Sequence, residues 1–227
     1  AGTITSSVSA NTTAGFSIVS FALEATGSKT VGHGLGVAPK MIIVKSRVNA
    51  ALWFVYHDSI GPTKFLRLDT AAAAATNSTT WNNTAPTSTL FTMGSGFTSG
   101  NYGTDQIAYC FADVEGYSKF GSYIGNGSAN GIFVYTGFRP KMVIIKTTSA
   151  AFDWVILDTE RNPYNLVHDV LYPSLANAEA DATTYASFDA VSNGFKLRNA
   201  HQYTNYNGYN YIYMAFAENP FKNSLAR

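Results

Sequence analysis

The sequence predicts an all-β fold made of two tandem, homologous halves, each like a β-sandwich or jelly roll, that together form one rigid unit. Three observations support this prediction. Short apolar runs rich in β-branched and aromatic residues alternate with turns rich in Gly, Asn, Ser and Thr. One such run occurs twice. The two copies lie about 100 residues apart, which is the length of one β-sandwich domain.

The repeated run is Ile107–Asp113, Ile-Ala-Tyr-Cys-Phe-Ala-Asp, which returns near the C-terminus as Ile212–Glu218, Ile-Tyr-Met-Ala-Phe-Ala-Glu. Both copies end in a carboxylate and follow a turn rich in Gly, Asn and Tyr. A second run, Pro39–Lys45, returns as Pro140–Lys146. The same spacing then leads from each of these runs to a tryptophan. Together the matches indicate a duplication.

Strands are expected where apolar or alternating runs lie between turn signals. In the first half these runs are Phe16–Phe21, Pro39–Lys45, Trp53–His57, Lys64–Leu68, Thr89–Met93 and Ile107–Asp113. In the second half they are Phe120–Ile124, Ile132–Tyr135, Pro140–Lys146, Trp154–Asp158, Phe195–Arg198 and Tyr211–Ala217. The glycines of Gly32–Gly36 predict tight turns before the strand that begins at Pro39. Residues 76–88 are expected to form a loop.

The domain boundaries follow from the repeat. Residues 1–15 are rich in Ser, Thr, Ala and Asn, which is typical of a linker or of an N-terminal strap lying against a neighbour. The first β repeat is expected over residues 16–118 and the second over residues 119–227. Val114–Lys119 leads directly from the last strand of one half to the first strand of the next, so the halves are expected to move as one body.

The composition limits the class of function. The chain is 46% hydrophobic and 13% charged, whereas an ordinary globular domain carries about 25% charged residues. The polar surface must therefore come from Ser, Thr, Asn, Gly and Tyr, a composition common in extracellular and virion-exposed β proteins. The net charge is +1 and no basic cluster is present, which argues against nucleic acid as a partner. No apolar run reaches the roughly 20 residues of a membrane span, so no membrane insertion is expected. The single cysteine, Cys110, excludes an internal disulfide and is expected to be a buried, inert thiol.

No catalytic or metal-binding pattern emerges. The four histidines lack metal-ligand spacing, and no pair of carboxylates is identifiable as the acid and base of a glycosidase. Gly32–Gly36 superficially suggests a phosphate loop, but a strand follows it where a dinucleotide fold requires a helix. The chain is therefore predicted to be no enzyme, with no cofactor and no metal.

Aromatic residues in polar loops are the candidate binding residues. They are Trp81, Tyr102, Tyr203, Tyr206 and Tyr209. Tyr and Trp offer flat apolar faces with hydrogen-bonding tips, and neighbouring Asn and Ser offer adaptable donors and acceptors, a combination that suits stacking on sugars. The alternative is that these rings pack beneath their loops or at a subunit interface.

Several linked motifs carry a resemblance to a known family. They are Val31–Lys45, Trp53–Asp58, Ile107–Ser122, Tyr135–Ile145 and Tyr211–Arg227. Through them nearly the whole chain beyond its first dozen residues resembles a domain of tailed-bacteriophage structural proteins, the tail fibre or tail proteins, that is common in marine phages. The resemblance implies a location in the virion, on the tail or another surface appendage. It supplies no catalytic motif.

Three hypotheses follow from the residues and the resemblance. The first is a non-enzymatic virion module, a tail-fibre or appendage domain, that attaches to host-surface glycan. It would assemble as a homo-oligomer, expected to be a trimer, and contact other tail or capsid proteins, because a lightly charged chain leaves apolar surface to cover. The second is a purely structural virion component without receptor binding, such as a fibre adaptor, capsid decoration or head fibre. The third, ranked last, is a polysaccharide-degrading spike domain.

Overall fold

The computed structural model describes residues 2–219, and β-strands dominate it. Strands account for 41% of the chain and helices for 5%, which confirms the all-β class. The chain divides into two compact units. Unit 1 comprises the described residues up to Leu68 together with Ala74–Asp113. Unit 2 comprises Asp69–Ala73 and the described residues from Val114 onward.

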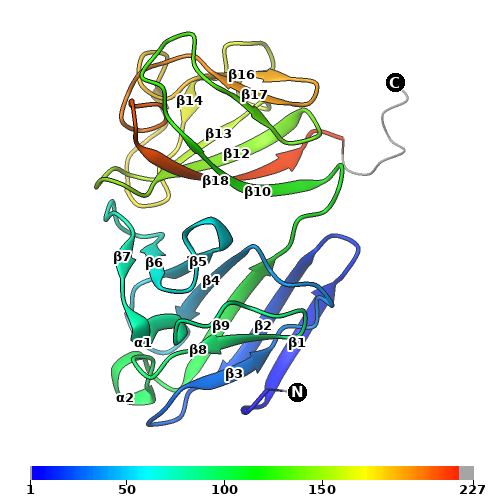
Figure 1. The fold of residues 1–227 in the computed structure, drawn as a ribbon, viewed down its shortest axis with the longest axis vertical. Coiled ribbons are helices and arrows are strands. Elements are labelled where there is room, and N and C mark those ends of the chain that lie inside the picture. Colours follow the sequence, from blue (N-terminus) through cyan, green and yellow to red (C-terminus); the bar gives the residue numbers. More distant parts are fainter. Residues whose placement is uncertain (1, 220–227) are drawn as a thin grey trace. The chain divides into compact units, whose positions relative to one another are not determined.

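Unit 1 contains a seven-stranded antiparallel sheet and a separate two-stranded sheet (Figure 1). In spatial order the large sheet consists of β1 (Ser6–Asn11), β2 (Phe16–Ala22), β9 (Asp105–Phe111), β4 (Met41–Ser46), β5 (Phe54–His57), β6 (Lys64–Arg67) and β7 (Ala75–Thr76). The small sheet pairs β3 (Lys29–Gly32) with β8 (Leu90–Met93). Short helical turns lie in the connections: η1 (Asp58–Ile60), α1 (Ser78–Trp81) and α2 (Ser99–Tyr102).

The core of unit 1 lies between these two sheets. Val19, Val44 and Ala108 from the large sheet are fully buried in one cluster. The same cluster includes Val31 of β3 and Phe91 of β8. The burial of β2 alternates along the strand, as expected where only one face of a sheet contacts this core. The unit is therefore a two-layer β-sandwich.

Unit 2 repeats the two-layer arrangement. Its larger sheet consists of β10 (Ser118–Ile124), β18 (Asn210–Ala217), β12 (Pro140–Thr147) and β13 (Val155–Asp158). A three-stranded sheet consists of β11 (Phe133–Tyr135), β17 (Gly194–Leu197) and β16 (Phe188–Val191), and β14 (Asp169–Val170) pairs with β15 (Ala180–Asp181). Val143 and Ala215 of the larger sheet share a buried cluster with Val134, Phe188 and Phe195 of the three-stranded sheet.

Four strands have the same order in both units. The order β2-β9-β4-β5 of unit 1 corresponds to β10-β18-β12-β13 of unit 2. The repeated sequence run begins within β9 in one unit and within β18 in the other, each paired on both sides. This is the arrangement that a duplication predicts, although homology of the halves stays a prediction. The smaller sheets differ. A Gly-Phe dipeptide precedes each copy of the repeated run, but Gly194-Phe195 begins β17 whereas Gly96-Phe97 follows the end of β8.

Residues 1–15 correct the expectation of a linker or strap, because most of their described part is a β-hairpin arm. All of β1 pairs antiparallel with β2, from Ser6 opposite Phe21 to Asn11 opposite Phe16. The turn is closed by the Asn11 side chain, which accepts from Ala14 N at 3.0 Å, and by Gly15 with φ of 62°. A polar composition is compatible with a strand here because β1 is the exposed edge of the sheet.

The boundary between the units lies close to the predicted one. Unit 1 ends at Asp113 and unit 2 resumes at Val114. One short segment departs from the simple division, because Asp69–Ala73 belongs to unit 2, where the Lys146 ammonium donates to Ala71 O at 3.0 Å. The predicted second repeat extends over residues 220–227, which lie outside the described residues. The expectation that the halves form one rigid unit stays a prediction.

The thiol of Cys110 is fully buried in β9, where the residue lies between Ser17 of β2 and Ile42 of β4. Burial raises the pKa of this thiol to about 12, and a hydrogen bond with Ser17 opposes part of the rise. Because the thiolate is the reactive form, we expect no labelling by a thiol reagent in the native state and complete labelling in denaturant. Mass spectrometry after timed alkylation measures this. Fast native labelling would show that β9 opens readily.

His33 holds the glycine-rich turn after β3. Its ring is fully buried, Nδ1 accepts from Leu35 N at 3.3 Å, and Nε2 lies 3.2 Å from Thr87 O. Because Nδ1 is an acceptor, the neutral tautomer with a proton on Nε2 satisfies both contacts. Burial lowers the pKa of His33 from 6.5, and the hydrogen bond to Thr87 O opposes this shift. His33 is therefore a structural residue of unit 1.

This placement predicts loss of stability in mild acid. Since the folded-state pKa of His33 is lowered, the unfolded chain binds an extra proton below about pH 6.5, and stability falls as the pH decreases from there toward the folded-state pKa. We expect His33→Gln to be less stable than the parent near neutral pH and to lose less stability on acidification. Thermal unfolding of both proteins between about pH 7 and pH 5 measures the difference. Equal losses would contradict the assignment.

Candidate functional site

The structure buries the first predicted binding residue, Trp81. Its side chain is 1% exposed and packs against Tyr56 and Phe97, with ring centroids 5.9 and 6.1 Å away. The predicted loop 76–88 instead contains α1, whose first turn is capped by the Asn77 side chain accepting from Thr79 N at 2.8 Å. That turn directs the indole into the core. The prediction of Trp81 as a binding residue was wrong.

Tyr102 also belongs mainly to the core of unit 1. It ends α2 and packs against Phe54 and Phe97, with ring centroids 5.5 and 4.8 Å away. The ring remains partly exposed and lines a small cavity beside Arg67, whose guanidinium lies 5.7 Å from the Phe54 ring. The aromatic residue supports the core here, as the alternative interpretation expected.

The other three predicted tyrosines lie in the loop between β17 and β18, which is held rigidly. Asn205 is fully buried, and its side-chain amide donates to Asn126 Oδ1, Ser128 O and Asn199 O at 2.7–2.9 Å. Gly125 lets its own backbone lie against the backbone of this loop, because a Cβ at position 125 would lie 2.2 Å from Tyr206 O. A buried network of hydrogen bonds therefore holds this loop in one conformation.

Tyr203 is the centre of a half-buried aromatic cluster on unit 2, which we call the Tyr203 cluster. Its members, besides Tyr203, are Phe152, Tyr172, Tyr185 and His201, and all are partly exposed. Each of these four rings contacts Tyr203, with ring centroids 5.4–6.0 Å away, and His201 stacks on it at an interplanar angle of 15°. The cluster forms where four separate loops of unit 2 converge.

Hydroxyl groups and one carboxylate accompany these rings. Tyr172 Oη donates to Tyr185 Oη at 3.0 Å, and Tyr203 Oη donates to Asp153 Oδ2 at 3.4 Å. Ser174 Oγ donates to Asp153 Oδ1 at 3.0 Å. Burial, followed by the charge of Asp153, raises the pKa of Tyr203, and burial raises that of Tyr172. The phenols therefore remain protonated and serve as neutral donors.

His201 adds no charge to the Tyr203 cluster at neutral pH. Burial lowers the pKa of its ring, and Nδ1 accepts from Tyr203 N at 3.4 Å. The position of Phe152 is fixed by the buried Lys146, whose ammonium donates to Phe152 O at 2.6 Å. Burial lowers the pKa of Lys146 to about 8, so the ammonium keeps its proton at neutral pH. The surface thus combines apolar ring faces with hydroxyl groups and the Asp153 carboxylate.

Tyr206 and Tyr209 occupy the tip of the same loop. Tyr206 is 42% exposed, Tyr209 is half-buried against the core of unit 2, and their ring centroids are 4.7 Å apart. Tyr206 N donates to Tyr211 Oη at 2.9 Å, which fixes the backbone of the tip. Of the five predicted residues, Tyr203, Tyr206 and Tyr209 therefore share one rigid loop, while Trp81 and Tyr102 belong to unit 1.

Sequence reasoning missed four members of the Tyr203 cluster. Phe152, Tyr172 and Tyr185 come from loops far apart in sequence, so no local pattern connects them. The only local signal was His201, two residues before Tyr203. Sequence reasoning also missed Tyr164, whose side chain is 84% exposed. Tyr164 lies beside a cavity of about 420 Å³ that is lined by Asn162, Asn165 and His168.

Three carboxylates near strand ends, Asp58, Asp158 and Glu218, have cationic partners. Lys40 Nζ contacts Asp58 Oδ2 at 2.7 Å, and Arg139 Nη1 contacts Glu218 Oε2 at 2.8 Å. Burial raises the pKa of Asp158. The hydrogen bonds and the charge of Arg161 lower it by more, so the net shift of this pKa is downward. Across residues 2–219, no three His, Cys, Asp or Glu side chains are grouped so that they could hold a metal ion.

Fold and site together define an antiparallel β protein of two units, with a half-exposed aromatic surface on the second. The chain belongs to the family described as a domain of unknown function (DUF7483), whose family model matches residues 1–220. No curated protein and no solved structure matches the chain. No helix within the described part of the chain is long and apolar enough to cross a membrane.

The rigidity of the loop between β17 and β18 predicts a large effect of Asn205. Asn205→Ala removes several buried hydrogen bonds and leaves carbonyl oxygens without donors, so we expect a loss of about 2–3 kcal/mol in the free energy of unfolding. Asn207→Ala, an exposed position in the same loop, is the matched control and should change stability little. Denaturant unfolding of both variants measures this. Equal effects would show that the Asn205 network does not hold the loop.

Proposed function

We propose that this chain is a non-enzymatic module of a bacteriophage virion, part of a tail fibre or similar appendage, that attaches to host-surface glycan. The resemblance of its linked motifs to tail-fibre and tail proteins supports the virion location. The Tyr203 cluster carries the binding part of the proposal, because it gathers five partly exposed rings on one rigid face. The assembly proposed with it is a homo-oligomer in contact with other tail or capsid proteins.

The chemistry of the cluster suits a sugar ring. The C–H-rich face of a sugar stacks on an aromatic face, while its hydroxyl groups need donors and acceptors at the rim. Here the Tyr185 phenol, which accepts from Tyr172, can donate to the sugar, and the Asp153 carboxylate and the phenol oxygens of Tyr172 and Tyr203 can accept from sugar hydroxyls. Tyrosine supplies this contact area at low conformational cost, since it has few rotatable bonds.

Substitutions in the cluster test the proposal. We expect Tyr203→Ala to weaken binding to host cells or to their purified surface polysaccharide by about tenfold, because it removes the central ring and about 1–2 kcal/mol of contact energy. Tyr185→Ala should also weaken binding. The measurement is saturable binding of the labelled chain, with free polysaccharide as competitor.

The matched control is Tyr135→Ala. Tyr135 is 64% exposed on unit 2 but lies in β11, outside the Tyr203 cluster. This variant should bind as the parent does. If all three variants fold and bind equally well, the cluster is not the binding surface. Release of reducing ends from the polysaccharide would instead favour the polysaccharide-degrading alternative.

A purely structural virion role is the second candidate, and exposed apolar side chains favour it. Ile124, Phe133 and Tyr135 are 62%, 47% and 64% exposed, respectively. Phe133 and Tyr135 lie on the same exposed face of β11, and neighbouring exposed apolar side chains that form a patch often mark contacts with other proteins. On this alternative the chain would act as a fibre adaptor, capsid decoration or head fibre and would bind no glycan. A well-folded chain that binds no cells of any host of the parent phage would favour it.

A further inference from the structure

The edge strand β1 lacks the features that usually prevent strand-to-strand association. It is six residues long, pairs with β2 on one side, and has no further strand on its other side among the described residues. Its sequence, Ser-Ser-Val-Ser-Ala-Asn, contains no charged residue and no proline. Natural edge strands are commonly protected by Lys, Pro, bulges or short length, because unpaired N–H and C=O groups pair readily with another chain.

The other edges within the described residues show these protections. Charged residues lie in six of the edge strands: Lys29 in β3, Lys119 in β10, Asp158 in β13, Asp169 in β14, Asp181 in β15 and Asp189 in β16. The uncharged edges are shorter than β1: β7 has two residues, β8 four and β11 three. Among the described strands β1 is therefore the longest edge without a charged residue.

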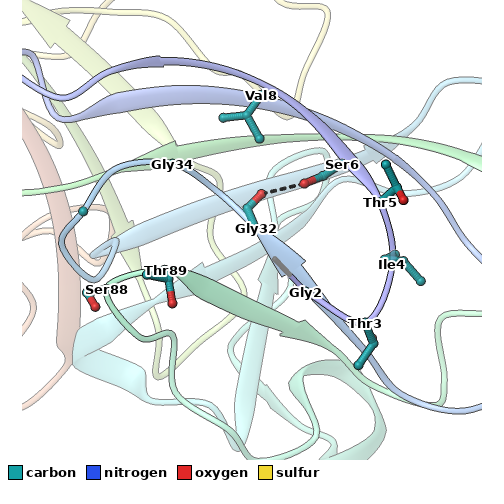
Figure 2. A pocket seen from close by; sticks show the side chains of 11 residues that line it. Gly2, Thr3, Ile4, Thr5, Ser6, Val8, Gly32, Gly34, Ser88 and Thr89 are labelled. Atoms are coloured by element: carbon teal, nitrogen blue, oxygen red, sulfur yellow. Dashed lines mark hydrogen bonds between the residues drawn. The ribbon is translucent and has the colours of Figure 1, made fainter.

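A groove lies beside β1, on the face of the sheet that holds the core of unit 1. Its volume is about 520 Å³, and it lies between the chain start at Gly2–Ser6 and the glycine-rich turn (Figure 2). Ser6 Oγ donates to Gly32 O at 3.1 Å across one end. Val8 lines the groove and is 40% exposed. A strand added to β1 would place its alternate side chains beside Val8, next to this groove.

Gly34 allows the glycine-rich turn, which forms one wall of the groove, to lie close to Val8. Gly34 has φ of +72°, and a Cβ at this position would lie 2.9 Å from Val8 Cγ1. The turn thus contacts Val8 through backbone atoms, and the valine methyl groups remain partly open to solvent. An apolar side chain that is exposed at an unprotected edge gains from burial when a second strand arrives.

We propose that β1 pairs antiparallel with β1 of a second copy of this chain, so that the two large sheets of unit 1 become continuous in a two-fold dimer. Self-pairing suits this strand because its uncharged residues bring no like charges together. In such a pair Ser6, Val8 and Ala10 of each copy share one face, which covers both exposed valines. Antiparallel pairing of identical segments is self-complementary, as a two-fold contact requires. The pairing does not depend on glycan binding.

The mass of the chain in solution tests the pairing. Because the contact is a single strand, it buries little surface, and the expected association is reversible. Sedimentation of the parent should show a mass that rises with concentration from one chain to two. A mass of one chain at every concentration would overturn the proposal. A mass of three chains, the state expected for a trimeric fibre, would overturn it as well.

Two lysine variants locate the contact. Val8→Lys places a charge at the centre of β1 and should leave the chain monomeric at concentrations where the parent dimerises. Val48→Lys is the matched control: Val48 is 54% exposed in a loop of unit 1 outside the strands, so this variant should dimerise as the parent does. Circular dichroism checks that both variants fold. A Val8→Lys protein that is folded and still dimeric would place the interface elsewhere.

Crosslinking gives a second readout that does not require disrupting the edge. Cys110 is buried, so Val8→Cys introduces the accessible thiol. A short bifunctional thiol reagent should link two Val8→Cys chains efficiently and link Val48→Cys chains only at the rate of random encounter. Equal yields from the two variants would overturn the proposal.

Discussion

The pairing register of the two large sheets depends on two central strands, β9 and β18. In unit 1 β9 pairs with β2 on one side and β4 on the other, and in unit 2 β18 pairs with β10 and β12 in the same way. Every other strand of the two large sheets takes its register from these ladders, directly or through a neighbour. Since a shift by one residue would turn each apolar set away from its core, burial on one face holds the register strongly. Two loops of the Tyr203 cluster adjoin these ladders: the loop between β12 and β13, which carries Phe152, and the loop between β17 and β18, which carries Tyr203.

Neutral hydrogen bonds and a few lysine ammonium groups fix the connections, in keeping with the low fraction of charged residues. The two units use one contact in common. Lys45 Nζ donates to Ala51 O at 2.5 Å in unit 1, and Lys146 Nζ donates to Phe152 O at 2.6 Å in unit 2, both across the same number of residues. Through this hydrogen bond each lysine, near the end of a strand, connects that strand to the loop that follows it. In unit 2 that hydrogen bond determines where Phe152 and Asp153 lie.

The sequence was sufficient for the fold class and for the central strands, because period-two alternation and the repeat are local or recur at fixed spacing. It was insufficient for β1, whose polar composition is typical of a linker and whose strand character depends on pairing with β2. It also failed for Trp81, because a short capped turn, rather than composition, sends the indole inward. The Tyr203 cluster required tertiary structure, since Phe152, Tyr172 and Tyr185 meet only where separate loops converge.

The two units use aromatic residues differently on the same four-strand order. In unit 1 Phe54, Phe97 and Tyr102 pack with Trp81 and close over the core. In unit 2 the rings around Tyr203 stay partly exposed and carry hydroxyl groups at their rim. By the spacing from the repeated tryptophans, Phe152 and Asp153 correspond to Ala51 and Leu52, which supply neither the ring nor the carboxylate. Because both units share this strand order, the difference lies in their loops, and in unit 2 the loops bring together partly exposed rings, hydroxyl groups and the Asp153 carboxylate.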